Sequence, residues 1–173
     1  REVQPYTDEN KRVRNRPTGR LLWIQNVKHF DHFEAKTLAN VPFGYVFPGS
    51  LKNVADKLSE HGIKVVTLPK KVKVETEQFN ITKFTKAARA SYGAHNTVTI
   101  EGSFVMKSAV AEAGSYYVDM RQPLAWLVFY MLEPQSDDGL LFWNYFDDYL
   151  LPKGVETGNV PYPVMKLMKP INL

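Results

Sequence analysis

The chain has 173 residues, no cysteine and a formal net charge of +4 at pH 7. Its apolar fraction of 44% is that of a globular domain and argues against wholesale disorder. The lack of cysteine excludes disulfides, thiolate nucleophiles and cysteine-ligated zinc, and no apolar run reaches the roughly 18 to 20 residues of a membrane span. Because the sequence begins at Arg1, without a signal-peptide pattern, we expect a processed chain or a fragment of a longer protein.

Most of the excess positive charge lies at the start of the chain. Within residues 1–20, six basic side chains stand against three acidic ones, which gives +3 of the total of +4. Prolines and a glycine interrupt any periodicity, so we predict a basic, flexible leader over 1–19. Nucleic-acid binding by residues 11–20 is an alternative. A solvated linker is favoured over a nucleic-acid partner, because no aromatic side chain interleaves these charges.

The next segment has helical spacing. Apolar side chains recur with a period of about 3.6 from Leu21 to Leu38, and Thr18 is a suitable N-cap. We therefore predict a connecting helix over 20–40, whose apolar face needs a partner surface.

Residues 41–173 are predicted to form one α+β domain. A strand over 43–47, a helix that begins after Ser50 and ends at Gly62, and a strand over 63–68 form a βαβ-like unit. Antiparallel strands follow, then a helix that is apolar all round and is therefore predicted to be buried on most sides, and a final short strand. The later strands are predicted at 72–86 (with a bulge near Glu77 and Gln78), 97–107 and 115–120, the helix at 122–132 and the final strand at 164–168.

None of the four histidines forms a recognisable zinc motif. His29 and His32 are three residues apart on the predicted connecting helix, with Glu34 nearby, but the third ligand would be His61 or His95, and nothing selects either. There is no Gly-x-Ser-x-Gly nucleophile motif. We expect no catalytic residue, no metal ligand and no cofactor site in this chain.

An aromatic-rich stretch over 140–150 is bracketed by the acidic pairs Asp137-Asp138 and Asp147-Asp148. With Glu133, these carboxylates are of the residue types found in glycosidase and calcium sites. No spacing supports either kind of site, so turn and capping roles are favoured. The alternative is a carbohydrate- or cell-wall-binding module, in which aromatic rings stack on sugars and carboxylates accept hydrogen bonds. Its candidate interaction surface comprises Trp143, Tyr145, Tyr149, Asp137 and Asp138.

Two groups of short motifs stand out in the predicted α+β domain. The first is Tyr45-Val46-Phe47-Pro48 before a helix and His61-Gly62-Ile63-Lys64-Val65 after it. The more specific group is the string Leu132-Glu133-Pro134-Gln135-Ser136-Asp137-Asp138-Gly139-Leu140, followed by Trp143-Asn144-Tyr145-Phe146-Asp147. Together they resemble the C-terminal region, downstream of the catalytic domain, of bacterial zinc carboxypeptidase-like proteins of the M14 type.

The resemblance implies a zinc site that lies elsewhere. In that family, a His-x-x-Glu pair and a later histidine of the upstream catalytic domain hold zinc. In this chain, the third residue after each of the four histidines is His32, Ala35, Lys64 and Val98 in turn, so no histidine forms a His-x-x-Glu pair. The resemblance therefore implies a non-catalytic accessory domain of a metallocarboxypeptidase, a hydrolase that acts in proteolysis. Its partner is the upstream catalytic domain, through which peptide or cell-wall substrate is reached, and the parent protein is expected to be secreted or periplasmic.

Overall fold

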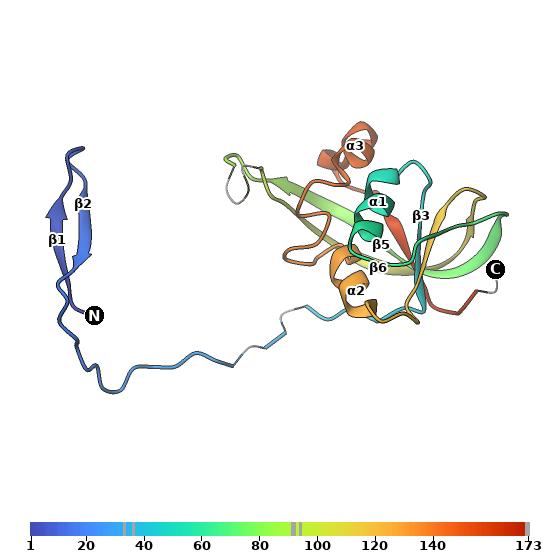
Figure 1. Cartoon of the computed structure of the whole chain (residues 1–173). Coiled ribbons are helices and arrows are strands. Elements are labelled where there is room, and N and C mark those ends of the chain that lie inside the picture. Colours follow the sequence, from blue (N-terminus) through green and yellow to red (C-terminus); the bar gives the residue numbers. More distant parts are fainter. Residues whose placement is uncertain (33, 36, 91–92, 94, 172–173) are drawn as a thin grey trace. The chain divides into compact units, whose positions relative to one another are not determined.

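The computed structural model describes residues 1–32, 34–35, 37–90, 93 and 95–171. The chain divides into two compact units, Arg1–Lys36 and Thr37–Leu173 (Figure 1).

The first unit contains an antiparallel hairpin of strands β1 (Val3–Thr7) and β2 (Val13–Pro17). Asp8 holds its turn: the carboxylate accepts hydrogen bonds from the backbone N–H of Asn10 at 3.0 Å and of Arg12 at 2.8 Å, and from Nε of Arg14 at 2.6 Å. The Arg14 guanidinium is the main reason why the pKa of Asp8 is lowered. An Asx-type turn therefore builds a hairpin where no secondary structure was predicted.

The predicted connecting helix over 20–40 is wrong for the described part of that range, which contains no helix; Phe33 and Lys36 lie outside the described residues. Its apolar side chains are exposed, Trp23 by 95% and Phe30 by 83%. Helical periodicity stabilises a helix mainly when the apolar face is packed against a partner, and these side chains are not packed.

The second unit is built on a six-stranded antiparallel sheet of order β4-β7-β3-β8-β5-β6. Strands β3 and β4 both pair antiparallel with β7, so they run parallel to each other with β7 between them. This arrangement confirms the βαβ-like unit and adds an inserted strand. The strands are β3 (Gly44–Phe47), β4 (Val66–Thr67), β5 (Val72–Lys86), β6 (Val98–Ala111), β7 (Tyr116–Asp119) and β8 (Val160–Leu167).

Strands β5 and β6 form a long hairpin that extends beyond the rest of the sheet (Figure 1). The pairing of β5 with β8 shifts register between Gln78 and Asn80, close to the bulge predicted from the change of alternation. The pairing of β5 with β6 shifts separately, between Ile81 and Lys83.

The helices α1 (Lys52–Glu60) and α2 (Ala125–Leu132) cover one face of this sheet. Gly62 follows α1 with φ of +81°, as predicted for the residue that ends this helix. Val54 and Leu58 of α1 and Val128 and Leu132 of α2 share one buried core with alternate side chains of the strands. A short helix α3 (Asp147–Leu150) and two 3₁₀ turns, η2 (Leu151–Lys153) and η3 (Val155–Thr157), lead into β8. The fold class is α+β, as predicted.

A buried ionic network ties α2 to the sheet. The Lys166 ammonium on β8 lies 3.0 Å from Glu77 Oε2 on β5 and 3.3 Å from Glu133 Oε1, immediately after α2. The Tyr45 hydroxyl of β3 donates to the same Glu133 oxygen at 2.6 Å. Burial is the main cause that raises the pKa of Glu133. Glu133 is therefore a structural carboxylate that joins three elements.

Candidate functional site: an aromatic groove between the helices

A groove of about 450 Å³ opens between the end of α1, the outer side of α2 and the turns over 138–145. Its floor is apolar, with Leu127, Met131 and Leu140. Its walls carry three aromatic rings, those of Tyr130, Trp143 and Tyr145, and its rim carries Lys57, His61 and Asp138. A concave apolar site with a few polar groups at its edge is the usual form of a ligand or partner site.

Trp143 is held in place on two sides. Its ring stacks on His95 with centroids 4.3 Å apart at 32°, and its indole N–H donates to the Asp138 carboxylate. His95 is in turn bonded through Nδ1 to Oδ1 of Asn144 at 2.9 Å, so the loop before β6 supports the indole. Trp143 is half-buried. The groove thus presents a pre-oriented aromatic side chain.

The polar groups of the groove are paired with neighbouring residues of the chain. The Tyr130 hydroxyl donates to Asp137 at 2.8 Å, and this bond is the main cause that raises the pKa of Tyr130. The Lys57 ammonium lies 2.9 Å from Glu60, which is the main cause that raises the pKa of Lys57. Nδ1 of His61 is 2.9 Å from the backbone oxygen of Lys57. Groups paired in this way suit recognition better than proton transfer.

The structure brings together only part of the interaction surface predicted from the sequence. Trp143, Tyr145 and Asp138 line the groove, and Asp137 lies beside it through its bond to Tyr130. Tyr149 lines a neighbouring hollow of about 310 Å³, which it shares with Tyr145. One face of the Tyr149 ring is covered by the Lys153 ammonium, 4.5 Å from the ring centroid.

The outer face of α2 continues the groove. The sequence predicts that this helix is buried on most sides, and its uncovered side carries Trp126, exposed by 71%, and Tyr130, exposed by 42%. These two residues are four apart, so they lie on the same side of the helix. They form an apolar surface, here called the α2 patch, that is uncovered in the described part of the chain.

The histidines do not form a zinc site. Without the helix, His29 and His32 do not share a face; they are exposed and lie near Asp31 at 3.4 Å and Glu34 at 3.8 Å. Within the described ranges, no three histidine, aspartate or glutamate side chains are grouped so that they would hold a metal ion. The residues present do not fit the zinc that the resemblance implies for the parent protein.

The acidic residues near the aromatic stretch are likewise dispersed. Asp147 is bound to the Lys86 ammonium at 2.6 Å and to the Asn144 amide at 3.3 Å, while Asp148 is exposed. Glu133 belongs to the buried network. Asp147 therefore supports the end of β5, and Glu133 supports the core.

Comparison with known proteins identifies a relationship to part of fungal carboxypeptidases. The chain is 30% identical over 126 residues to carboxypeptidase 2 of Trichophyton equinum and of Trichophyton rubrum, and 29% identical to that of Trichophyton tonsurans. Each match covers 73% of this chain and 22% of the relative, so the chain spans about a fifth of the length of these relatives. No family model and no solved structure matches the sequence.

The chain is thus a carboxypeptidase-related region, as the motifs indicated. These relatives are fungal, and the expected bacterial origin is not confirmed. None of the helices in the described ranges has the length and apolar content that a bilayer span requires.

Proposed function

We propose that this chain is a non-catalytic accessory domain of an M14-type zinc metallocarboxypeptidase. The relationship to a limited part of proteins named carboxypeptidase 2 supports the proposal. On this proposal, zinc and peptide hydrolysis belong to an upstream catalytic domain of the same protein. The parent protein is secreted or periplasmic and acts on peptide or cell-wall substrate, and the accessory domain shapes access to the catalytic cleft.

The α2 patch is the observation that carries the proposal. A fully exposed large aromatic side chain that becomes covered removes about 150–250 Å² from water, worth about 4–6 kcal/mol at 25 cal/mol per Å². Because most of the Trp126 side chain is exposed in this chain, most of that free energy of burial is still available to a contact with another domain. Interfaces between domains typically bury about 600–1,500 Å². The α2 patch, together with the adjoining groove, offers a surface of the right chemistry for such a contact.

The contact is tested by hydroxyl-radical labelling of this chain and of the longer parent protein, with sites of oxidation read by mass spectrometry. We expect Trp126 and Tyr130 to be labelled several-fold more slowly in the parent. Met106, exposed by 58% on the edge strand β6, is the control and should be labelled equally in both. Equal labelling of Trp126 in both proteins would contradict packing through the α2 patch.

The non-catalytic assignment has a separate test. The purified chain is incubated with zinc and an N-blocked dipeptide, and bound metal and released amino acid are measured. We expect neither stoichiometric zinc nor product. Tight one-to-one zinc binding with hydrolysis would overturn the assignment even if the α2 patch is an interface.

The second candidate function is carbohydrate or cell-wall binding in the groove. The observation that favours it is the convergence of Tyr130, Trp143 and Tyr145 with Asp138, because aromatic faces and carboxylate acceptors are what sugar rings bind. Titration calorimetry with an N-acetylglucosamine oligosaccharide tests it. Binding that is lost in Tyr145→Ala supports this function. No heat at millimolar ligand removes it.

A further inference from the structure

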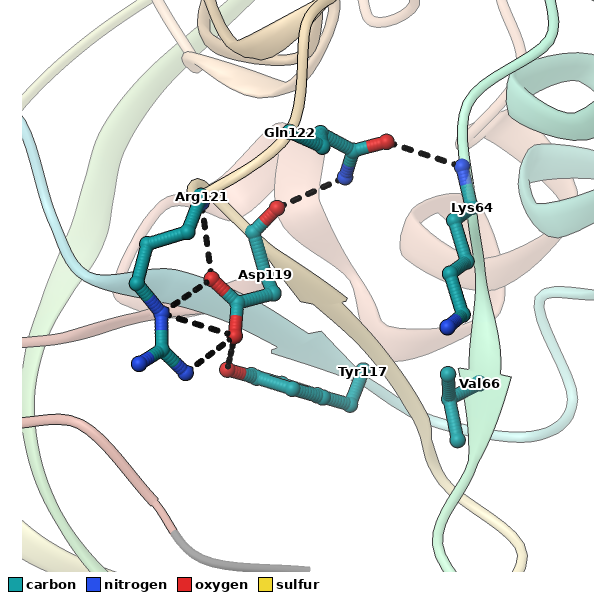
Figure 2. A pocket seen from close by; sticks show the side chains of 6 residues that line it. All are labelled: Lys64, Val66, Tyr117, Asp119, Arg121 and Gln122. Carbon is teal, nitrogen blue, oxygen red and sulfur yellow. Dashed lines mark hydrogen bonds and ion pairs between the residues drawn. The ribbon is translucent and has the colours of Figure 1, made fainter.

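Another hollow, here called the edge pocket, lies where the sheet ends at β4 (Figure 2). It encloses about 420 Å³ and is lined by Lys64, Val66, Tyr117, Asp119, Arg121 and Gln122. Val66 of β4 stands opposite Tyr117 of β7, so their side chains share one face. Tyr117 belongs to the smaller core cluster, which contains no helix residue. The edge pocket therefore opens on the side of the sheet away from the aromatic groove.

One wall of the edge pocket is a fixed ion pair. The Asp119 carboxylate accepts from Arg121 Nη2 at 2.6 Å and from the Arg121 backbone N–H at 2.7 Å, and the Tyr117 hydroxyl donates to it at 3.0 Å. The side-chain bonds to Arg121 are the main cause that lowers the pKa of Asp119 to about 2. Asp119 is thus ionised, but its charge is matched by Arg121, and its acceptor sites are occupied.

The opposite wall carries a cation that has no counter-charge among the described residues. Lys64 lies across the strand pair from Asp119 by continuation of the β4–β7 register. Even so, no ion pair among the described residues involves its ammonium group, and Figure 2 shows that group on the far side of the pocket from the Asp119–Arg121 pair. With Arg121 neutralised by Asp119, Lys64 leaves the edge pocket with one net positive charge.

The backbone around both walls is locked. The Gln122 side chain accepts from the Lys64 backbone N–H at 2.9 Å and donates to the Asp119 backbone oxygen at 2.6 Å. The Tyr117 ring packs over Gly44, where a Cβ would lie 2.7 Å from the ring. A ligand therefore meets a preformed pocket and does not have to order it.

We propose that the edge pocket binds a small organic carboxylate that carries an apolar group next to its acid. The carboxylate lies against the Lys64 ammonium, and the apolar group packs on the surface that Val66 and the ring of Tyr117 form together. A peptide C-terminus and a free aromatic acid both have this chemistry. The inference rests on the geometry of the edge pocket and does not depend on the proposed role of the α2 patch.

The test is a titration of the isotope-labelled full chain followed by amide NMR shifts. The ligands are N-acetyl-phenylalanine, its uncharged C-terminal amide, phenylpropionate and inorganic phosphate. We expect both carboxylates to shift the amides of Lys64, Val66 and Gln122 with millimolar affinity. If only N-acetyl-phenylalanine does so, the natural source is a peptide end; if both do, any aromatic acid is accepted. The amide and phosphate should bind at least several-fold more weakly.

Two variants decide the role of the cation. Lys64→Gln should weaken carboxylate binding by about threefold to tenfold, as expected for one exposed charge-assisted contact. The matched control Lys70→Gln, at another exposed lysine nearby, should leave it unchanged. Equal affinity for the acid and its amide, phosphate binding as tight as the acids, shifts confined to other regions, or an unchanged affinity in Lys64→Gln would each overturn the proposal.

Discussion

Replacement of Lys166 by methionine tests the buried network most directly. The Lys166 side chain is 2% exposed, and its ammonium is within 3.3 Å of oxygens of Glu77 and Glu133 and 4.1 Å from the centroid of the Phe104 ring. Methionine keeps most of the apolar stem and removes the charge. Two nearly buried carboxylates would then face each other without a cation.

The expected loss follows from that arrangement. Removing one partner of a buried ion pair typically costs about 3–5 kcal/mol, because the remaining charge stays buried and uncompensated. We therefore expect Lys166→Met to lower the free energy of unfolding by about that amount, measured by urea denaturation with far-UV circular dichroism. The double variant Lys166→Met/Glu133→Gln should recover part of the loss, with a coupling energy of about 1–3 kcal/mol. A single variant within about 0.5 kcal/mol of the wild type would refute the reasoning.

Three further substitutions test other contacts of the second unit. Glu133→Gln should become more stable relative to the wild type as the pH rises from about 4 to about 8. Burial raises the pKa of Glu133, so the wild type has the stability that this carboxyl contributes below its ordinary pKa and loses it as the folded form ionises, whereas Gln does not ionise. A difference in urea midpoints that does not change with pH would contradict this. Gly44→Ala should cost about 1–3 kcal/mol, because the new Cβ would lie 2.7 Å from the Tyr117 ring, and an unchanged thermal midpoint would argue against it. Asn144 has φ of +67° and binds His95, so Asn144→Ala should lower the free energy of unfolding by about 1–3 kcal/mol and Asn144→Gly should lower it less. Identical urea curves for the two variants would speak against backbone strain.

The local elements were predictable because their signals are local. Alternation over Val72–Lys86 predicted β5, and the apolar face from Leu51 to Leu58 predicted α1 with Gly62 after it. The prediction of a connecting helix over 20–40 failed because helical periodicity shows only that one face of a helix would need burial. It does not show that a partner surface is present to bury it. For α2, uniform apolarity did not reveal that the side with Trp126 is uncovered.

The sites were less predictable than the elements. Trp143 and Tyr145 were found because they lie in one aromatic run of sequence. Tyr130 and Lys57 were missed, since they reach the groove from two helices that only the fold brings together. The edge pocket had no sequence signal, because strand pairing alone brings Lys64 and Asp119 to opposite walls of one pocket. Contacts between distant residues carry no local pattern by which they are recognised.

The most direct test of the accessory-domain account is binding in trans. On the proposed function, the parent protein has a catalytic region. That region is expressed without this chain, and its affinity for the purified chain is measured by calorimetry. We predict association that Trp126→Ser weakens by at least about thirtyfold, the effect of losing an aromatic interface anchor worth about 2 kcal/mol or more. Met106→Ser, at an exposed apolar position outside the α2 patch, should bind like the wild type. No association, or an equal loss in both variants, would contradict the account.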